Sequence, residues 1–119
     1  MLDDILKNVV DSQRGLRALV LVDRDGMLVS VAGQVGNGAL EVLAASYTDI
    51  ARRVESIHGE AELQAPAELT AMGPEGTVLH HQVTPDYGVI AVLDPDATLG
   101  RIRYEIRKIA GRLIPELAT

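Results

Sequence analysis

The sequence predicts an α/β domain of the α+β kind, with a largely antiparallel five-stranded sheet covered by amphipathic helices. Three observations predict it. Three segments repeat apolar residues every three or four positions, five short segments are rich in branched apolar residues, and turn residues separate neighbours. The predicted order is helix, two strands, helix, three strands, helix. With 119 residues, of which 47% are hydrophobic, we expect one domain spanning residues 1–119.

The first and last segments have the apolar spacing of amphipathic helices. Residues 2–13 carry one apolar stripe, formed by Leu2, Ile5, Leu6, Val9 and Val10. Near the other end, Asp94-Pro95-Asp96 is typical of a helix start, with an Asp cap and a proline at the first helical position. The last helix is expected to end at Pro115.

Two pairs of apolar runs predict antiparallel hairpins. Residues 16–22 and 27–32 are joined by a turn that ends in Asp25-Gly26, a strong hairpin signal. Residues 77–83 and 88–93 are joined by Thr84-Pro85-Asp86 in the same way. Because the first run hardly alternates between apolar and polar residues, we expect both faces of that strand to be covered.

A central helix is predicted to run from a cap at Asn37 to about His58. Its apolar stripe steps by three and four residues through Leu40, Leu43, Tyr47, Ile50, Val54 and Ile57. The opposite side carries the small or apolar residues Val42, Ala45 and Ser46. Small residues there would let another backbone approach closely, although alanine is also common on helix surfaces without a partner.

The segment from Glu68 to Met72 is predicted to be an edge strand. It is short, follows Pro66, and is polar on one face. An unpaired edge is a template for a strand of another chain. The alternative is that the edge stays short and hydrated, protected by Pro66 and Glu68.

Composition excludes several classes of protein. The net charge of −6 repels a phosphate backbone, and the three tyrosines are the only aromatic residues, so we expect no nucleic-acid partner. The basic last helix suits its own dipole. No apolar run approaches the roughly 20 residues of a membrane span, so no membrane insertion is expected. The sequence has no cysteine and starts without the basic region of a signal peptide, which predicts a cytosolic protein.

No pattern in the sequence supports a metal site. Asp23-x-Asp25-Gly26 resembles the opening of a calcium loop, but the later ligand positions hold Met27 and Gln34. His80 and His81 are neighbours on one strand and point to opposite faces. We therefore expect neither a metal nor a cofactor.

Catalytic patterns are equally absent from the sequence. The glycines at 33, 36 and 38 lack the Lys-Ser/Thr of a phosphate loop. No serine occupies a nucleophile elbow, and the neighbouring carboxylates Asp3/Asp4 and Asp94/Asp96 sit at helix starts. The sequence predicts a protein that is not an enzyme.

Two passages resemble the Roadblock/dynein-light-chain family. They are GLRALVLVDRDGMLVS at 15–30 and AVLDPDATLGRIRYEIRKIA at 91–110, and together with the element order the resemblance covers nearly the whole chain. The chain is similar to bacterial single-domain members, including the MglB-type regulators of Ras-like GTPases. The resemblance implies a profilin-like sheet, with the terminal helices on one face and the central helix on the other.

The resemblance also implies a homodimer. Members of the family pair their third strands into one ten-stranded sheet and lay their central helices side by side. Carried onto this chain, the dimer interface would contain residues of the central helix and of the edge strand: Val42, Ala45, Ser46, Asp49, Glu68, Leu69, Thr70, Ala71 and Met72.

The function implied is a non-enzymatic scaffold that binds an MglA-type small GTPase and modulates its nucleotide cycle. The docking platform would be the exposed side of the central helix: Glu41, Val42, Ala45, Thr48, Asp49, Arg52 and Arg53. A role of Arg52 or Arg53 as an arginine finger is disfavoured, because the helix dipole alone explains a basic residue there. The alternatives are an adaptor without effect on hydrolysis, or a PAS- or profilin-like ligand sensor with a pocket of roughly 300 Å³ or more.

Overall fold

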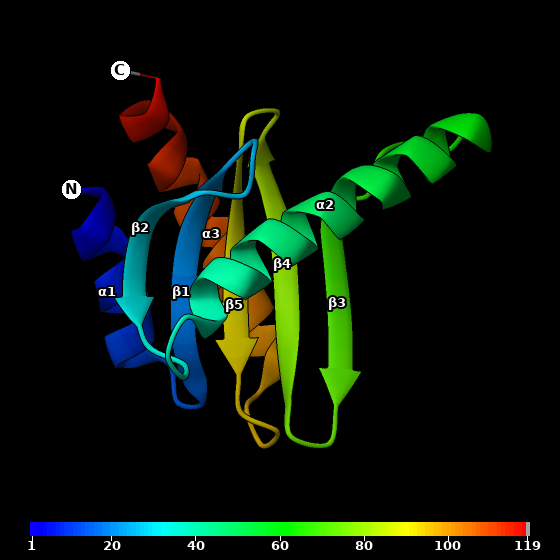
Figure 1. Ribbon diagram of the computed structural model, residues 1–119. Helices are drawn as coiled ribbons and strands as arrows, with labels where there is room; N and C mark the ends of the chain where they lie inside the picture. Colours follow the sequence, from blue (N-terminus) through cyan, green and yellow to red (C-terminus); the bar gives the residue numbers. More distant parts are fainter. Residues whose placement is uncertain (119) are drawn as a thin grey trace.

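The structure is a computed structural model that describes residues 1–118, and it contains one sheet and three helices (Figure 1). Its elements are α1 (Leu2–Ser12), β1 (Leu16–Asp23), β2 (Leu28–Gly33), α2 (Ala39–Glu60), β3 (Glu68–Gly73), β4 (Gly76–Thr84), β5 (Tyr87–Leu93) and α3 (Leu99–Leu117). This is the order that the sequence predicts.

The five strands form one antiparallel sheet in the order β2-β1-β5-β4-β3. The last strand, β5, occupies the middle of the sheet, where its Ile90 lies between Val20 of β1 and His80 of β4. The central strands β1 and β5 are therefore almost fully buried. The two edges of the sheet are β2 and β3.

Helices cover both faces of the sheet: α1 and α3 lie on one face, and α2 crosses the other (Figure 1). Successive side chains of β1 alternate between the two layers. Leu19 and Leu21 pack with α1 and α3, whereas Ala18 and Val20 pack with α2. This explains why the first strand is apolar on both faces, and it confirms the predicted fold class.

The helix α2 begins differently from the prediction. Its N-cap is Gly38, in the left-handed conformation with a φ of 70° and with no side-chain capping bond. The prediction that Asn37 caps this helix is therefore wrong, because the chain turns into α2 through a glycine whose conformation is open to few other residues.

The helix α3 differs from the prediction at both ends. It starts at Leu99 after Thr98, because Asp94 to Ala97 form a separate turn closed by a 3.1 Å backbone hydrogen bond. It also continues through Pro115 to Leu117. A proline this close to the C-terminus removes only one hydrogen bond of the helix, so the last turn survives.

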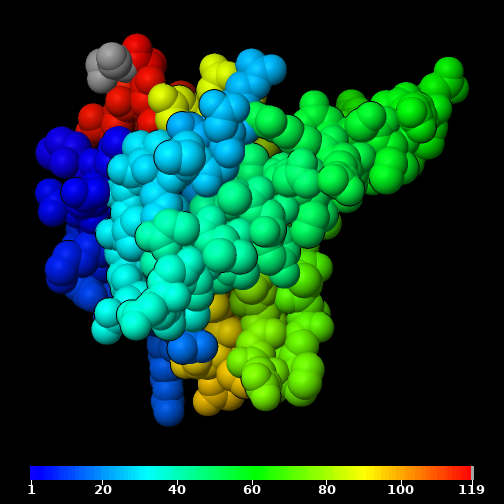
Figure 2. Space-filling model, in the orientation of Figure 1, coloured from blue at the N-terminus to red at the C-terminus, as the bar shows by residue number. Residues whose placement is uncertain are grey.

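The helix α2 leaves the sheet before it ends. It runs diagonally, and its C-terminal part projects past β3 as an arm (Figures 1 and 2). The residues buried against the sheet are Leu40, Ala44 and Thr48, which are four positions apart. Ile50 and Ile57 were predicted to belong to the core stripe, but they are 42% and 60% exposed. They lie to one side of the contact line, and Ile57 lies on the projecting part.

Candidate functional site

The strand β3 is an open edge of the sheet. Its residues pair with β4 from Glu68 opposite His81 to Gly73 opposite Gly76, and within residues 1–118 nothing pairs with its other side. The predicted edge strand is confirmed. The unpaired backbone groups of such an edge can bond to another strand.

Glu68 does not guard this edge. Its carboxylate accepts two hydrogen bonds from Nε of Arg103 on α3, at 2.7 and 2.9 Å, and one from the Thr70 hydroxyl at 2.7 Å. Burial by itself would raise the pKa of Glu68, but these hydrogen bonds outweigh it and lower the pKa. The negative charge of Glu68 therefore points toward α3 and not toward the open edge. Met72, near the end of β3, is 74% exposed.

One flank of α2 presents apolar side chains to solvent. We call it the open flank; it follows steps of three and four residues through Val42, Ser46, Ile50, Arg53 and Ile57. Val42 is 65% exposed, and all the other residues of the flank are exposed as well. Exposed apolar residues arranged in a row on one helix are typical of an interaction surface.

The remaining residues predicted on α2 lie largely at the surface. Glu41, Ala45 and Asp49 are exposed, and Asp49 pairs with Arg53 at 3.2 Å one helical turn later. Side chains of this kind can contact a partner without disturbing the core. Their roles in an interface stay predictions.

Thr48 does not lie on the exposed side of α2, and that expectation is wrong. It is only 8% exposed, because it continues the buried line of Leu40 and Ala44. Arg52 lies one turn further along the same side, half-exposed, with its guanidinium 3.9 Å from Asp25 in the β1–β2 turn. Arg52 and Arg53 therefore extend from different sides of the helix.

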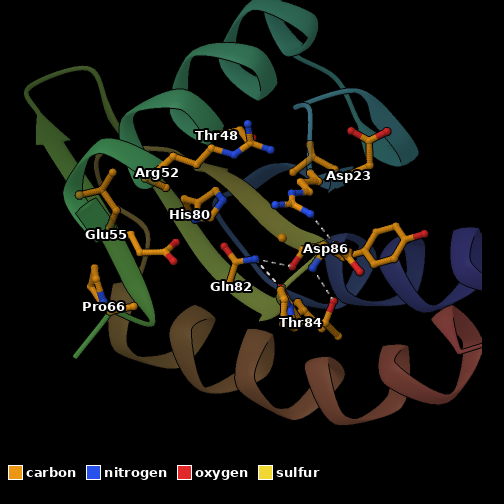
Figure 3. A pocket seen from close by; sticks show the side chains of 18 of the residues that line it. Asp23, Thr48, Arg52, Glu55, Pro66, His80, Gln82, Thr84 and Asp86 are labelled. Atoms are coloured by element: carbon orange, nitrogen blue, oxygen red, sulfur yellow. Dashed lines mark hydrogen bonds and ion pairs between the residues drawn. The ribbon is translucent and has the colours of Figure 1, made fainter. Parts of the chain in front are cut away.

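A cavity of about 760 Å³ lies on this second side of α2 (Figure 3). Thr48, Arg52 and Glu55 form its helical wall, and His80 and Gln82 of β4 form its floor. The cavity is open to solvent and lies beyond the two apolar clusters, whose buried side chains fill the core on each face of the sheet. Nothing in the sequence pattern pointed to it, because its walls come from segments that are distant along the chain.

The two sequence patterns considered for a metal site, at Asp23–Gly26 and at His80–His81, have other roles in the structure. Oδ1 of Asp23 accepts hydrogen bonds from the backbone of Asp25 and Met27, at 2.9 and 3.0 Å, so this carboxylate closes a turn. His80 faces the α2 layer and His81 lies across the sheet from it. Among residues 1–118, no three candidate ligands gather into a metal site.

No helix within residues 1–118 is long and apolar enough to cross a bilayer.

Solved structures share this arrangement over almost the whole chain. Myxococcus xanthus MglB superposes with a TM-score of 0.89 at 18% identity, covering 98% of this chain and 94% of its own. A Roadblock/LC7 domain from Streptomyces avermitilis superposes with a TM-score of 0.90 at 15% identity, covering 98% of both chains. The chain has the Roadblock/LC7 fold. The resemblance stated from the sequence is thus confirmed for the fold.

A further structure with the Roadblock fold, described as MglB with a tetrameric arrangement, has a TM-score of 0.83 at 17% identity. The match covers 92% of this chain and 82% of the other. A scan against family models finds no match, and neither does a search of curated proteins. At these identities the fold is shared, and a shared fold does not by itself determine function.

Proposed function

We propose that this Roadblock domain forms a cytosolic homodimer that binds an MglA-type Ras-like small GTPase and modulates its nucleotide cycle. The observation that carries the proposal is the position of an open sheet edge beside an exposed apolar helix flank. The helix α2 crosses the sheet and projects past β3 (Figure 1), and the edge and the flank are each of the kind that a second copy can cover.

The proposed dimer pairs β3 with β3 of a second copy about a two-fold axis. Antiparallel pairing of two identical edges is self-complementary, as a closed dimer requires. The projecting part of α2 would then lie over the partner's sheet, beside the partner's α2. Pairing in this way would cover Val42, Ile50 and Ile57 of the open flank together with Met72. The predicted interface residues Leu69, Thr70 and Ala71 of β3 supply its backbone contacts.

The proposed docking platform for the GTPase is the outward surface of the two paired helices. On this chain it contains Glu41, Ala45, Asp49 and Arg53, all exposed, with Val42 at the boundary to the dimer interface. Thr48 is left out because it is buried, and Arg52 because it lies beside the cavity.

The proposed regulator contributes no catalytic group. Arg53 is paired with Asp49 within its own helix, and a side chain held in this way is poorly placed to stabilise charge on a transferred phosphate. A rigid surface that binds one conformation of the GTPase switch segments better than the other shifts their equilibrium, and this changes hydrolysis or exchange.

The test combines three measurements on the purified protein. Sedimentation gives the mass, which should be twice 12.7 kDa. Mixing the protein with Ras-like GTPases encoded near it should yield a complex whose nucleotide turnover differs from that of the GTPase alone. Binding without a change in turnover would select the adaptor alternative. A strict monomer without binding would contradict the whole proposal.

A further inference from the structure

The cavity beside α2 has the size of a small-molecule site. Its volume of about 760 Å³ falls within the roughly 300–1,000 Å³ that is usual for ligand pockets. It is bounded by α2, by the start of β3 and by the turns β1–β2 and β4–β5, all from a single chain (Figure 3). The cavity is therefore complete in one copy of the chain, although Leu69 in its wall also belongs to the proposed dimer interface.

Two polar side chains in its walls are more than nine-tenths buried. Thr48 is 8% exposed, and within residues 1–118 its hydroxyl has no hydrogen-bond partner. A buried hydroxyl without a partner is unusual, because folding has stripped it of water without compensation. His80 is 4% exposed. Its ring packs against Gly88, where a Cβ would lie 2.8 Å from the His80 Nε2 and so would clash with the ring.

Two further polar groups that face the cavity are acceptors. The amide nitrogen of Gln82 donates to the backbone oxygens of Thr84 and Tyr87, the latter at 3.2 Å, so its oxygen faces the cavity (Figure 3). The Glu55 carboxylate also reaches into the cavity and has no hydrogen-bond or ion-pair partner among residues 1–118 (Figure 3). Burial, followed by the proximity of His81, lowers the pKa of His80, so this ring is neutral at pH 7 and adds no positive charge.

The positive charges at the rim are already partnered. Arg24 lies 3.8 Å from Asp86, and Arg52 lies 3.9 Å from Asp25. The charges left over at the cavity are those of Glu55 and of Asp23, both negative, and Asp23 Oδ1 already accepts two backbone hydrogen bonds. A ligand that complements the cavity therefore carries positive charge and several hydrogen-bond donors.

We propose that this cavity binds a guanidinium group, either of a small molecule or of an arginine side chain. A guanidinium is planar and always charged, and it offers five N–H donors. The Glu55 carboxylate can accept two of them, and the Gln82 oxygen can accept another. The apolar edge formed by Ala51 and Leu69 suits the methylene chain that carries such a group.

The experiment titrates the ¹⁵N-labelled protein with three probes and follows its amide and histidine ring resonances. The probes are agmatine, a capped Gly-Arg-Gly peptide, and the same peptide with neutral citrulline in place of arginine. Agmatine and the arginine peptide should shift the resonances of Thr48, His80 and Gln82, and citrulline should bind at least 10-fold more weakly. Tighter binding of the peptide than of agmatine identifies a protein side chain as the source; the reverse order identifies a small molecule.

Two variants separate the site from unspecific attraction to an acidic protein. Glu55→Gln should weaken the binding of agmatine about 10-fold, whereas Glu60→Gln, which removes the same charge from the same helix outside the cavity, should leave it unchanged. Each spectrum also reports whether the variant is folded. The proposal is overturned if neither arginine probe shifts these resonances, if citrulline binds as well, or if the two variants lose affinity equally.

Discussion

Arg103 of α3 holds Glu68 of β3 through both carboxylate oxygens, across 35 positions of sequence. The pair ties the edge strand to the helix layer on the far side of the sheet, and the Thr70 hydroxyl adds a third bond at 2.7 Å. The strand most available for pairing with another chain is therefore fastened through its side chains, while its outer backbone stays open.

Glu68→Gln should lower the free energy of unfolding by about 1 kcal/mol at pH 7, the scale of a partly exposed ion pair. Because folding lowers the pKa of Glu68, its contribution is present above the pKa of the unfolded state, about 4.3, and is lost as the pH falls through the folded value. Urea unfolding at pH 7 and at pH 3 measures the change, which should shrink at the lower pH. Glu75→Gln, in the exposed β3–β4 turn, is the control. An equal loss at both pH values would contradict the assignment.

Val42→Glu should dissociate the proposed dimer. The proposed dimer covers Val42, so the new carboxylate would be buried there without a partner, which costs more free energy than the lost apolar contact. Sedimentation should show the mass fall from twice 12.7 kDa to a single copy. Met27→Glu is a matched control, since Met27 is likewise 65% exposed but lies in the β1–β2 turn. If both variants or neither dissociate, the open flank is not the interface.

Thr48→Val should stabilise the protein by about 1 kcal/mol. The substitution keeps the shape of the side chain and removes a buried hydroxyl that has no partner within residues 1–118. Thr48→Ser keeps the hydroxyl and removes a methyl group, so it should act in the opposite direction. Denaturant unfolding of both variants tests this, and a loss of stability with valine would show that the hydroxyl has a partner in solution.

Gly26→Ala should cost about 2 kcal/mol or more. Gly26 has a φ of 82°, and an added Cβ would lie 2.9 Å from the Cα of Ala45, so the β1–β2 turn and α2 could not keep their close contact. Gly36→Ala meets nothing nearer than 3.9 Å and should change stability by less than about 0.5 kcal/mol. Thermal unfolding of the two variants makes the comparison, and equal melting temperatures would contradict it.

Arg53→Ala should leave any stimulated GTP hydrolysis within about 3-fold of wild type. An arginine finger contributes roughly 10³-fold or more, whereas Arg53 is paired within its own helix. Single-turnover hydrolysis at saturating regulator separates the two cases, because saturation removes any effect on affinity. A loss of 100-fold or more would show that this arginine enters the GTPase site.

Local patterns were enough to predict the element order, the edge position of β3 and the coverage of both faces of β1. Each of these depends on properties of neighbouring residues: periodicity, proline position and a run of branched side chains. The same patterns misplaced the starts of α2 and α3. The helix α2 starts after a left-handed Gly38, and α3 starts after Thr98, which follows a separate turn.

The sequence by itself therefore determined which segments form helices and strands, and which side of each is apolar. Only the tertiary structure decided how far α2 follows the sheet. The path of α2 buries Thr48 and leaves Ile50 and Ile57 outside the core. It also brought Glu68 to Arg103 and formed a solvent-open cavity between α2 and β4. The physical reason is that a helical period defines a face, whereas the crossing angle of that face on the sheet depends on packing among residues far apart in the chain.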